Sequence, residues 1–194
     1  MTFTQKLTFA DYLALEDTGI EGRAELIEGE LIALPPESRI NTEIATFVFS
    51  SLLAIAIHYL LKLYSCEVQT PVLEPRDAAN RYPALVLIRE EHRALCDRRM
   101  TITLEMPPPL WVMEVVSPGK TNRDRDYIRK RAQYAAVGIP EYVIVDPEEQ
   151  AVLVLRLEQG EYIEAGRYTS ECPLQSPTFP ALNLTAAQIL SAGQ

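Results

Sequence analysis

The run at residues 111–117 reads Trp-Val-Met-Glu-Val-Val-Ser and is bounded by Pro109 and Pro118. A short, valine-rich run between two prolines predicts a central β-strand that is buried on both faces. Glu114 is the charged residue within it, and burying an ionised carboxylate costs several kcal/mol unless a partner compensates the charge. The pattern therefore predicts a cation beside Glu114, either a metal ion in an enzyme site or a Lys or Arg in a structural ion pair.

The hydrophobic pattern of the rest of the chain predicts a sheet with helices packed against it. Capping residues and amphipathic spacing predict helices at 8–19, 38–63, 123–137 and 184–190, and the charged segment 90–99 is also able to form a helix. Alternating or continuous apolar runs predict a hairpin at 24–34 around Glu28-Gly29, strands at 67–73, 82–88 and 141–145, and an edge strand at 152–157.

Residues 44–61 are mostly apolar, and their number approaches the roughly 20 that span a bilayer. Ser50 and His58 interrupt the run, and no tryptophan flanks it. We therefore expect a long helix buried in the core and no contact with a membrane. His58 would then be a core histidine, whereas His92 would lie on the surface.

The predicted helix at 123–137 follows the strand of Glu114, and projecting it at 100° per residue separates two faces. Lys130 lies on the same face as Tyr127 and Tyr134. A lysine that is partly desolvated beside a buried carboxylate puts a positive charge where anionic chemistry occurs. An acid four residues before Lys130 supports a different interpretation, an ordinary ion pair on the helix surface. The spacing leaves both interpretations open.

Composition limits the partners and the compartment. The chain has 194 residues, 47% of them hydrophobic, which suits one domain with a sizeable core over residues 1–194. Its formal charge of −9 opposes tight non-specific binding to nucleic acid, so a phosphate contact needs a local basic patch. The three cysteines form no CxxC pair, and the N-terminus has no basic and apolar leader. We therefore expect a cytoplasmic protein.

Basic residues gather in two places, each interleaved with acids. The groups are Arg123, Arg125, Arg129, Lys130 and Arg131 on the predicted helix, and Arg89, Arg93, Arg98 and Arg99 before the strand of Glu114. The acids cancel much of this charge, which favours solvated, salt-bridged helices. The alternative is a rim that contacts phosphates beside a cleft.

Several longer motifs carry a resemblance to a known family. They include Leu-Ile-Glu-Gly-Glu-Leu, Met-Pro-Pro-Pro-Leu, Glu-Val-Val-Ser-Pro-Gly-Lys, Asn-Arg-Asp-Arg-Asp-Tyr, Lys-Arg-Ala-Gln-Tyr-Ala-Ala and Gly-Ile-Pro-Glu-Tyr-Val-Ile-Val-Asp-Pro. From about residue 7 to 190, the chain resembles the bacterial Uma-two family, restriction endonuclease-like proteins of the PD-(D/E)XK nuclease superfamily. The resemblance implies an α/β fold of the α+β type, with a mixed sheet flanked by helices and an N-terminal helix and hairpin added to the nuclease core.

The resemblance also implies a metal-dependent endonuclease, with DNA favoured over RNA as the substrate and Mg²⁺ or Mn²⁺ as cofactor. Glu114 corresponds to the superfamily's second acid and would bind the metal, with the Val115 carbonyl as a further ligand. The superfamily's lysine normally stands two residues after that acid, where this chain has Val116. Lys130 from the following helix matches the amine that family members supply instead, and Lys120 is the less favoured substitute.

One departure from the family bears directly on activity. The superfamily's first acid follows a proline, and here Pro83 is followed by Ala84. Alanine cannot bind a metal, so we expect the ion to be held weakly, if at all, and the chain to be inert or nearly so. The alternative function is a non-catalytic protein that keeps the nuclease fold for binding or assembly.

Three other acids could contribute to the site. Nucleases of this superfamily often use a further glutamate, and Glu67, at the start of a predicted strand, is the candidate. Solvated surfaces explain Glu25 and Glu43 about as well. An apolar edge strand and a proline-rich tail also lead us to expect a homodimer.

Overall fold

The computed structural model of the chain describes residues 6–193, and the elements below belong to this part. The expectation about a leader sequence concerns residues that lie mostly outside it. The largest sheet has six strands, which are in spatial order β11 (Glu161–Tyr168), β10 (Ala151–Glu158), β9 (Glu141–Asp146), β8 (Trp111–Val115), β6 (Leu85–Leu87) and β3 (Leu61–Leu63). Only β8 and β9 run parallel among these neighbours, so the sheet is mixed.

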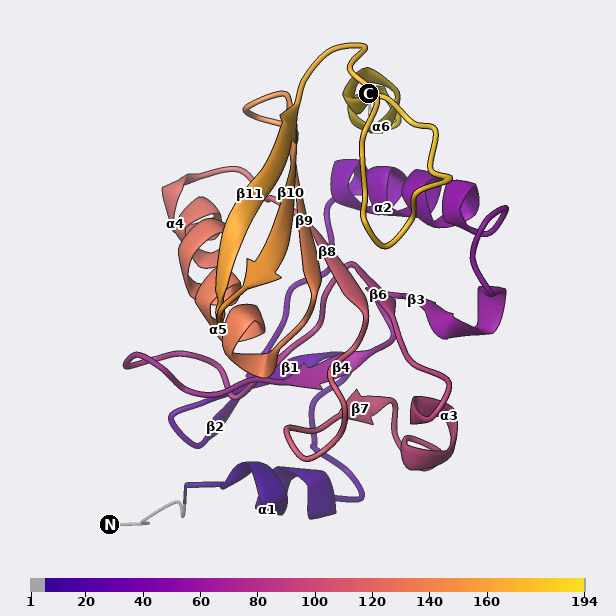
Figure 1. Cartoon of the computed structure of the whole chain (residues 1–194). Helices are drawn as coiled ribbons and strands as arrows, with labels where there is room; N and C mark the ends of the chain where they lie inside the picture. Colours follow the sequence, from indigo (N-terminus) through magenta and orange to yellow (C-terminus); the bar gives the residue numbers. More distant parts are fainter. Residues whose placement is uncertain (1–5, 194) are drawn as a thin grey trace.

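Helices cover both faces of this sheet (Figure 1). α2 (Arg39–Leu52) and α6 (Ala186–Ser191) lie on one face, and α4 (Lys120–Asp124) and α5 (Lys130–Val137) lie on the other. A π-helical turn at Arg125–Arg129 joins α4 and α5 into one continuous helix. The predicted fold class, a mixed sheet flanked by helices, is confirmed.

The N-terminal helix and hairpin are also present. α1 (Phe9–Ala14) begins with the predicted capping box but is shorter than predicted. β1 (Ala24–Ile27) pairs with β2 (Glu30–Ala33) through a turn in which Glu28 and Gly29 have φ angles of 50° and 83°. Positive φ at both positions is what this two-residue hairpin turn requires. A further sheet within the described residues consists of β5 (Asn80–Arg81), β4 (Glu67–Gln69) and β7 (Thr101–Ile102).

The long helix predicted at 38–63 is wrong in its C-terminal half. Ser38 caps α2 as expected, but α2 ends at Leu52, and a 3₁₀ turn at His58–Leu60 leads into β3. The apolar residues just beyond α2 are exposed. A helix that continued to residue 63 would prevent β3 from pairing with β6. The apolar pattern alone does not reveal this pairing. No helix within residues 6–193 is long and apolar enough to cross a membrane.

The strands predicted at 67–73 and 82–88 are shorter than expected and lie in different sheets. β4 and β6 span three residues each. Pro71 and Pro83 interrupt the runs because proline lacks the N–H that a strand ladder needs. Residues 152–157 lie in β10, between β9 and β11, and so not at an edge. That expectation was wrong, which removes one reason to expect a homodimer.

The two histidines are placed opposite to expectation. His58 is exposed, and His92, in α3 (His92–Leu95), is fully buried. The backbone N–H of Arg89 donates to His92 Nδ1 at 3.1 Å, which leaves Nε2–H to donate to the Pro107 carbonyl at 2.7 Å. Burial lowers the pKa of His92 below its usual value near 6.5. His92 is therefore neutral in the folded protein at neutral pH.

Acidification is expected to destabilise the protein through His92. Because the folded pKa is lowered, its contribution to the free energy of unfolding is complete above about pH 6.5 and is lost as pH falls through the lower folded value. When urea unfolding is measured from pH 6.5 downwards, the free energy of unfolding should fall more steeply with pH for the wild type than for His92→Gln. The difference in slope should be up to about 1.4 kcal/mol per pH unit. The exposed His58→Gln is the matched control, with a wild-type slope. Equal slopes for the wild type and His92→Gln would contradict the assignment.

Candidate active site

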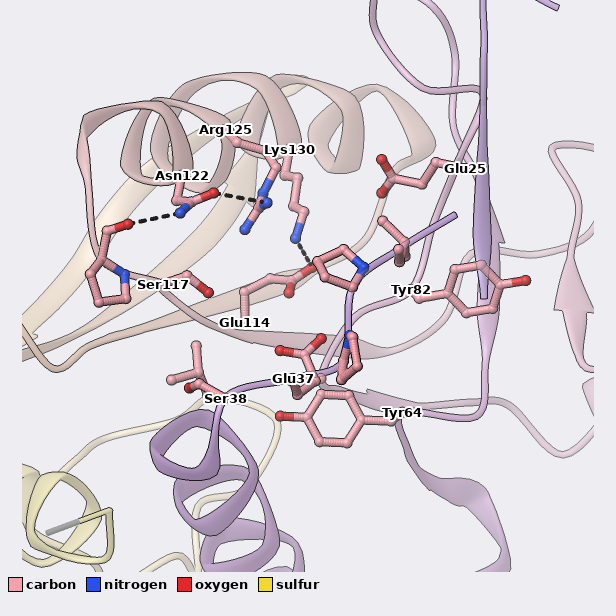
Figure 2. Close-up of a pocket in the computed structure, with 16 residues that line it drawn as sticks. Glu25, Glu37, Ser38, Tyr64, Tyr82, Glu114, Ser117, Asn122, Arg125 and Lys130 are labelled. Carbon is pink, nitrogen blue, oxygen red and sulfur yellow. Dashed lines mark hydrogen bonds and ion pairs between the residues drawn. The ribbon is translucent and has the colours of Figure 1, made fainter. Parts of the chain in front are cut away.

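A cavity of about 330 Å³ lies at the end of β8 that carries Glu114. Its walls come from segments far apart in the sequence: β1, the linker 34–38, the residues around Tyr64 and Tyr82, β8 and the helix that contains Lys130. Figure 2 shows Glu114 and Lys130 joined within this cavity, with Arg125 and Asn122 from the same helix beside them. The fold thus brings the predicted strand acid and helix lysine together.

The Glu114 carboxylate is buried and engaged on one oxygen by two donors. Lys130 Nζ lies 2.9 Å from Glu114 Oε1, and the Tyr134 hydroxyl donates to the same oxygen at 2.7 Å. Burial raises the pKa of Glu114, and the ammonium opposes that rise. The predicted need for a cation beside this acid is met within the protein by Lys130.

Lys130 is held between two acids and is not on the surface. Its ammonium lies 2.8 Å from Asp126 Oδ1, and the exposed fractions of the two side chains are 7% and 0%. Burial alone would lower the pKa of Lys130, but Asp126 and Glu114 together raise it. The pKa of Asp126 is lowered by Lys130 and Arg125, which outweigh its burial. The pair of Asp126 and Lys130 exists, but the interpretation that places it on the helix surface is wrong.

The helix geometry explains why these side chains meet. Asp126, Lys130 and Tyr134 are spaced by four residues; Asp126 lies within the π-helical turn, and Lys130 opens α5 directly after it. Residues four apart are neighbours on one side of a helix, and π-turns are frequent at functional sites. The spacing of four identified Asp126 as the partner of Lys130 from the sequence, but not its burial or its place in the site.

Position 84 lies directly beside Glu114. Leu85 of β6 pairs with Met113 of β8, and one step further along this antiparallel register brings Ala84 opposite Glu114. Ala84 is 3% exposed and lines the same cavity. Opposite residues on antiparallel strands have Cβ atoms about 5 Å apart and point to the same face. An acid at position 84 would therefore sit beside the Glu114 carboxylate.

Of the other predicted ligands, Val115 lines the cavity, and its carbonyl oxygen accepts a hydrogen bond from the Asn41 side-chain amide at 3.4 Å. Lys120 is exposed and pairs with Asp124, away from the cavity lining. The less favoured substitute for Lys130 is therefore not part of this cluster.

Glu67 lies outside the cavity lining, in the small sheet. Its carboxylate accepts hydrogen bonds from the Tyr12 hydroxyl at 2.9 Å, Asn80 Nδ2 at 2.5 Å and the Thr101 hydroxyl at 2.6 Å, and Arg99 lies 3.3 Å away. All of these partners come from α1 and from the small sheet or its flanking loops. The fold does not bring Glu67 to Glu114 and Lys130, because β4 joins β5 and β7 instead of the main sheet.

Every carboxylate at or next to the cavity has a cationic partner in the protein. The pairs are Glu25 with Arg81, Glu37 with Arg23, Glu114 with Lys130, and Asp126 with Lys130 and Arg125. No group of three or more His, Cys, Asp or Glu side chains able to hold a metal occurs in residues 6–193. Mg²⁺ requires octahedral oxygen coordination and usually one or two carboxylates. With Ala84 opposite an acid that is already paired, the residues present do not fit this ion.

The basic groups expected near the cleft are also paired internally. Examples are Arg123 with Asp146 at 2.8 Å and Arg129 with Asp77 at 2.5 Å, and Arg89 donates to a backbone carbonyl. Glu43 likewise pairs with its neighbour Arg39 at the surface. These contacts agree with salt-bridged helices and leave less free positive charge for phosphate binding.

Comparisons with known proteins agree with this architecture. Residues 9–187 match the model of the Uma2 family, described as "Putative restriction endonuclease". A crystal structure of "a putative nuclease belonging to DUF820 from Anabaena variabilis ATCC 29413" aligns with a TM-score of 0.64 over 97% of this chain and 99% of that one, at 19% identity. That likeness shows a shared fold. None of the curated proteins compared with the chain matches it.

Proposed function

The chain belongs to the Uma2 family of restriction endonuclease-like proteins, and from this premise we propose that it is a metal-dependent DNA nuclease whose hydrolytic site is incomplete. The observation that carries the proposal is Ala84, which stands opposite Glu114 where a second acid is needed. In phosphodiester hydrolysis a divalent ion polarises the phosphate and lowers the pKa of a bound water. A chain that cannot hold this ion firmly should cleave DNA very slowly or not at all.

In this proposal each residue of the cluster keeps the place that the family gives it. Glu114 and the Val115 carbonyl are what remains of a Mg²⁺ or Mn²⁺ site, Lys130 is the catalytic amine, and position 84 is the vacated acid. Asp126 positions Lys130 and Tyr134 positions Glu114, because Asp126 contacts the Lys130 ammonium and Tyr134 donates to the Glu114 carboxylate. Glu67 is assigned a structural role.

The second candidate is a non-catalytic protein that binds DNA or assembles with itself through the nuclease fold. The internal pairing of the cavity's acids and bases favours it, because such pairing stabilises a fold without any bound ion. The homodimer expected from the sequence belongs to this proposal. With β10 inside the sheet, the long outer strand available for pairing is β11.

The test is to incubate the chain with Mg²⁺ or Mn²⁺ and with double-stranded DNA, single-stranded DNA and RNA. We expect cleavage no faster than with Glu114→Gln, with folding of both confirmed by circular dichroism. Gel-shift measurements on the same substrates distinguish the candidates, because a binding protein retains DNA without cutting it. Metal-dependent cleavage that disappears in Glu114→Gln would contradict the proposed incompleteness.

A further inference from the structure

One nitrogen atom bridges two buried carboxylates that come from different elements. Lys130 Nζ lies 2.9 Å from Glu114 Oε1, on β8, and 2.8 Å from Asp126 Oδ1, on the helix. The exposed fractions of the Glu114 and Asp126 side chains are 6% and 0%. Figure 2 shows the Lys130 side chain extending from the helix to Glu114 across the cavity. This arrangement joins the strand to the helix through a single cation.

A divalent ion bound between the same two acids would make equivalent connections. Mg²⁺, Mn²⁺ and Ca²⁺ favour carboxylate oxygens, and Mg²⁺ usually keeps several waters and takes only one or two protein carboxylates. Glu114 and Lys130 line the cavity and Asp126 does not, so such an ion would reach this position from the side of Glu114. The ammonium supplies positive charge there without a bound ion.

We propose that, between Glu114 and Asp126, the Lys130 ammonium takes the place of a divalent cation, and that its removal converts these two acids into a divalent-cation site separate from the one that position 84 would share with Glu114. The inference goes beyond the proposed nuclease function, because it concerns which cation holds the strand and the helix together. The fold of the wild type would accordingly be independent of metal ions.

The other groups around the cluster do not replace this cation. Arg125 lies 3.2 Å from Asp126, and its guanidinium donates hydrogen bonds to Asp126 and Asn122. Tyr134 donates a hydrogen bond to Glu114 but carries no charge. Without the ammonium, we therefore expect Glu114 to take up either a proton or a metal ion. The two results are distinguishable, because only the second responds to added metal.

The test is thermal unfolding of Lys130→Met in EDTA and in millimolar Mg²⁺, Mn²⁺ or Ca²⁺. A variant that binds one ion well below the added concentration should gain about 5 °C or more in Tm. The wild type and Lys120→Met should show no such gain, because Lys120 is also paired with an aspartate four residues away but is 86% exposed. The double variant Glu114→Gln/Lys130→Met should lose the gain, because one of the two carboxylates is gone.

Three results would overturn the inference. The first is a folded Lys130→Met whose Tm is the same with and without metal, which would mean that Glu114 is protonated instead. The second is a Lys130→Met that fails to fold in EDTA and is not rescued by refolding with Mn²⁺. The third is Mn²⁺ binding by the wild type that depends on Glu114, measured by the paramagnetic signal of the ion. Since none of these readouts is cleavage, a failure here is separate from a failure of the nuclease proposal.

Discussion

Replacing Lys130 with methionine is expected to lower the free energy of unfolding by about 3–5 kcal/mol in metal-free buffer at neutral pH. The substitution keeps most of the side-chain volume but leaves the Glu114 carboxylate buried without a cation and deprives Asp126 of one of its two partners. Breaking a buried ion pair from one side is costly because the remaining charge stays desolvated. Urea unfolding in EDTA measures the loss.

Two comparisons separate this effect from a general loss of packing. Lys120→Met removes an exposed lysine from the same helix and should leave the unfolding curve unchanged within error. Glu114→Gln/Lys130→Met removes both charges of the pair and should recover part of the stability. If Lys130→Met cost no more than an ordinary surface substitution, the ammonium would not be the compensating charge of Glu114.

The second large effect is expected from Ala84→Asp, which should raise Mg²⁺- or Mn²⁺-dependent cleavage of DNA about 10³-fold or more. The new carboxylate would stand opposite Glu114 and add a negative charge to a cluster whose acids are now all paired. A correctly held ion contributes several kcal/mol to stabilisation of transition-state charge, and each 1.36 kcal/mol is tenfold in rate. Initial rates on the same DNA, with and without metal, give the comparison.

Ala84→Asn is the matched control for this prediction. Asparagine has the same size as aspartate but no charge, so it tests shape without supplying an anionic ligand. Ala84→Asp/Glu114→Gln should return cleavage to the wild-type level. Equal rates for Ala84→Asn and Ala84→Asp would mean that the gain does not come from a restored metal ligand.

Local elements of the fold were predictable because their signals are local. The Glu28-Gly29 turn, the capping box at Thr8 and the αL glycine after α5, Gly138 with φ 88°, depend on neighbouring residues. The end of α2 at Leu52 and the burial of His92 were not predictable, because they depend on β3 pairing with β6 and on the Pro107 carbonyl. Such contacts form only when distant segments pack.

The candidate site divides in the same way. Glu114 and Lys130 could be identified because an acid in a valine-rich strand needs a cation and the following helix offers one. The burial of Asp126 could not be predicted, because it depends on the packing of the helix against β9. There the Tyr142 hydroxyl donates to the Asp126 carbonyl at 2.9 Å. The sequence did not show that Glu67 lies outside the cavity, because an apolar pattern predicts a strand but not the sheet that the strand joins.

Calorimetric titration with Mn²⁺ of the chain as it stands and of Ala84→Asp tests most directly the claim that the site lacks one acid. We expect Ala84→Asp to bind the ion and Glu114→Gln to abolish this binding, whereas the unaltered chain should give no measurable heat of binding. Equal binding of Mn²⁺ by both proteins, through Glu114, would contradict this claim.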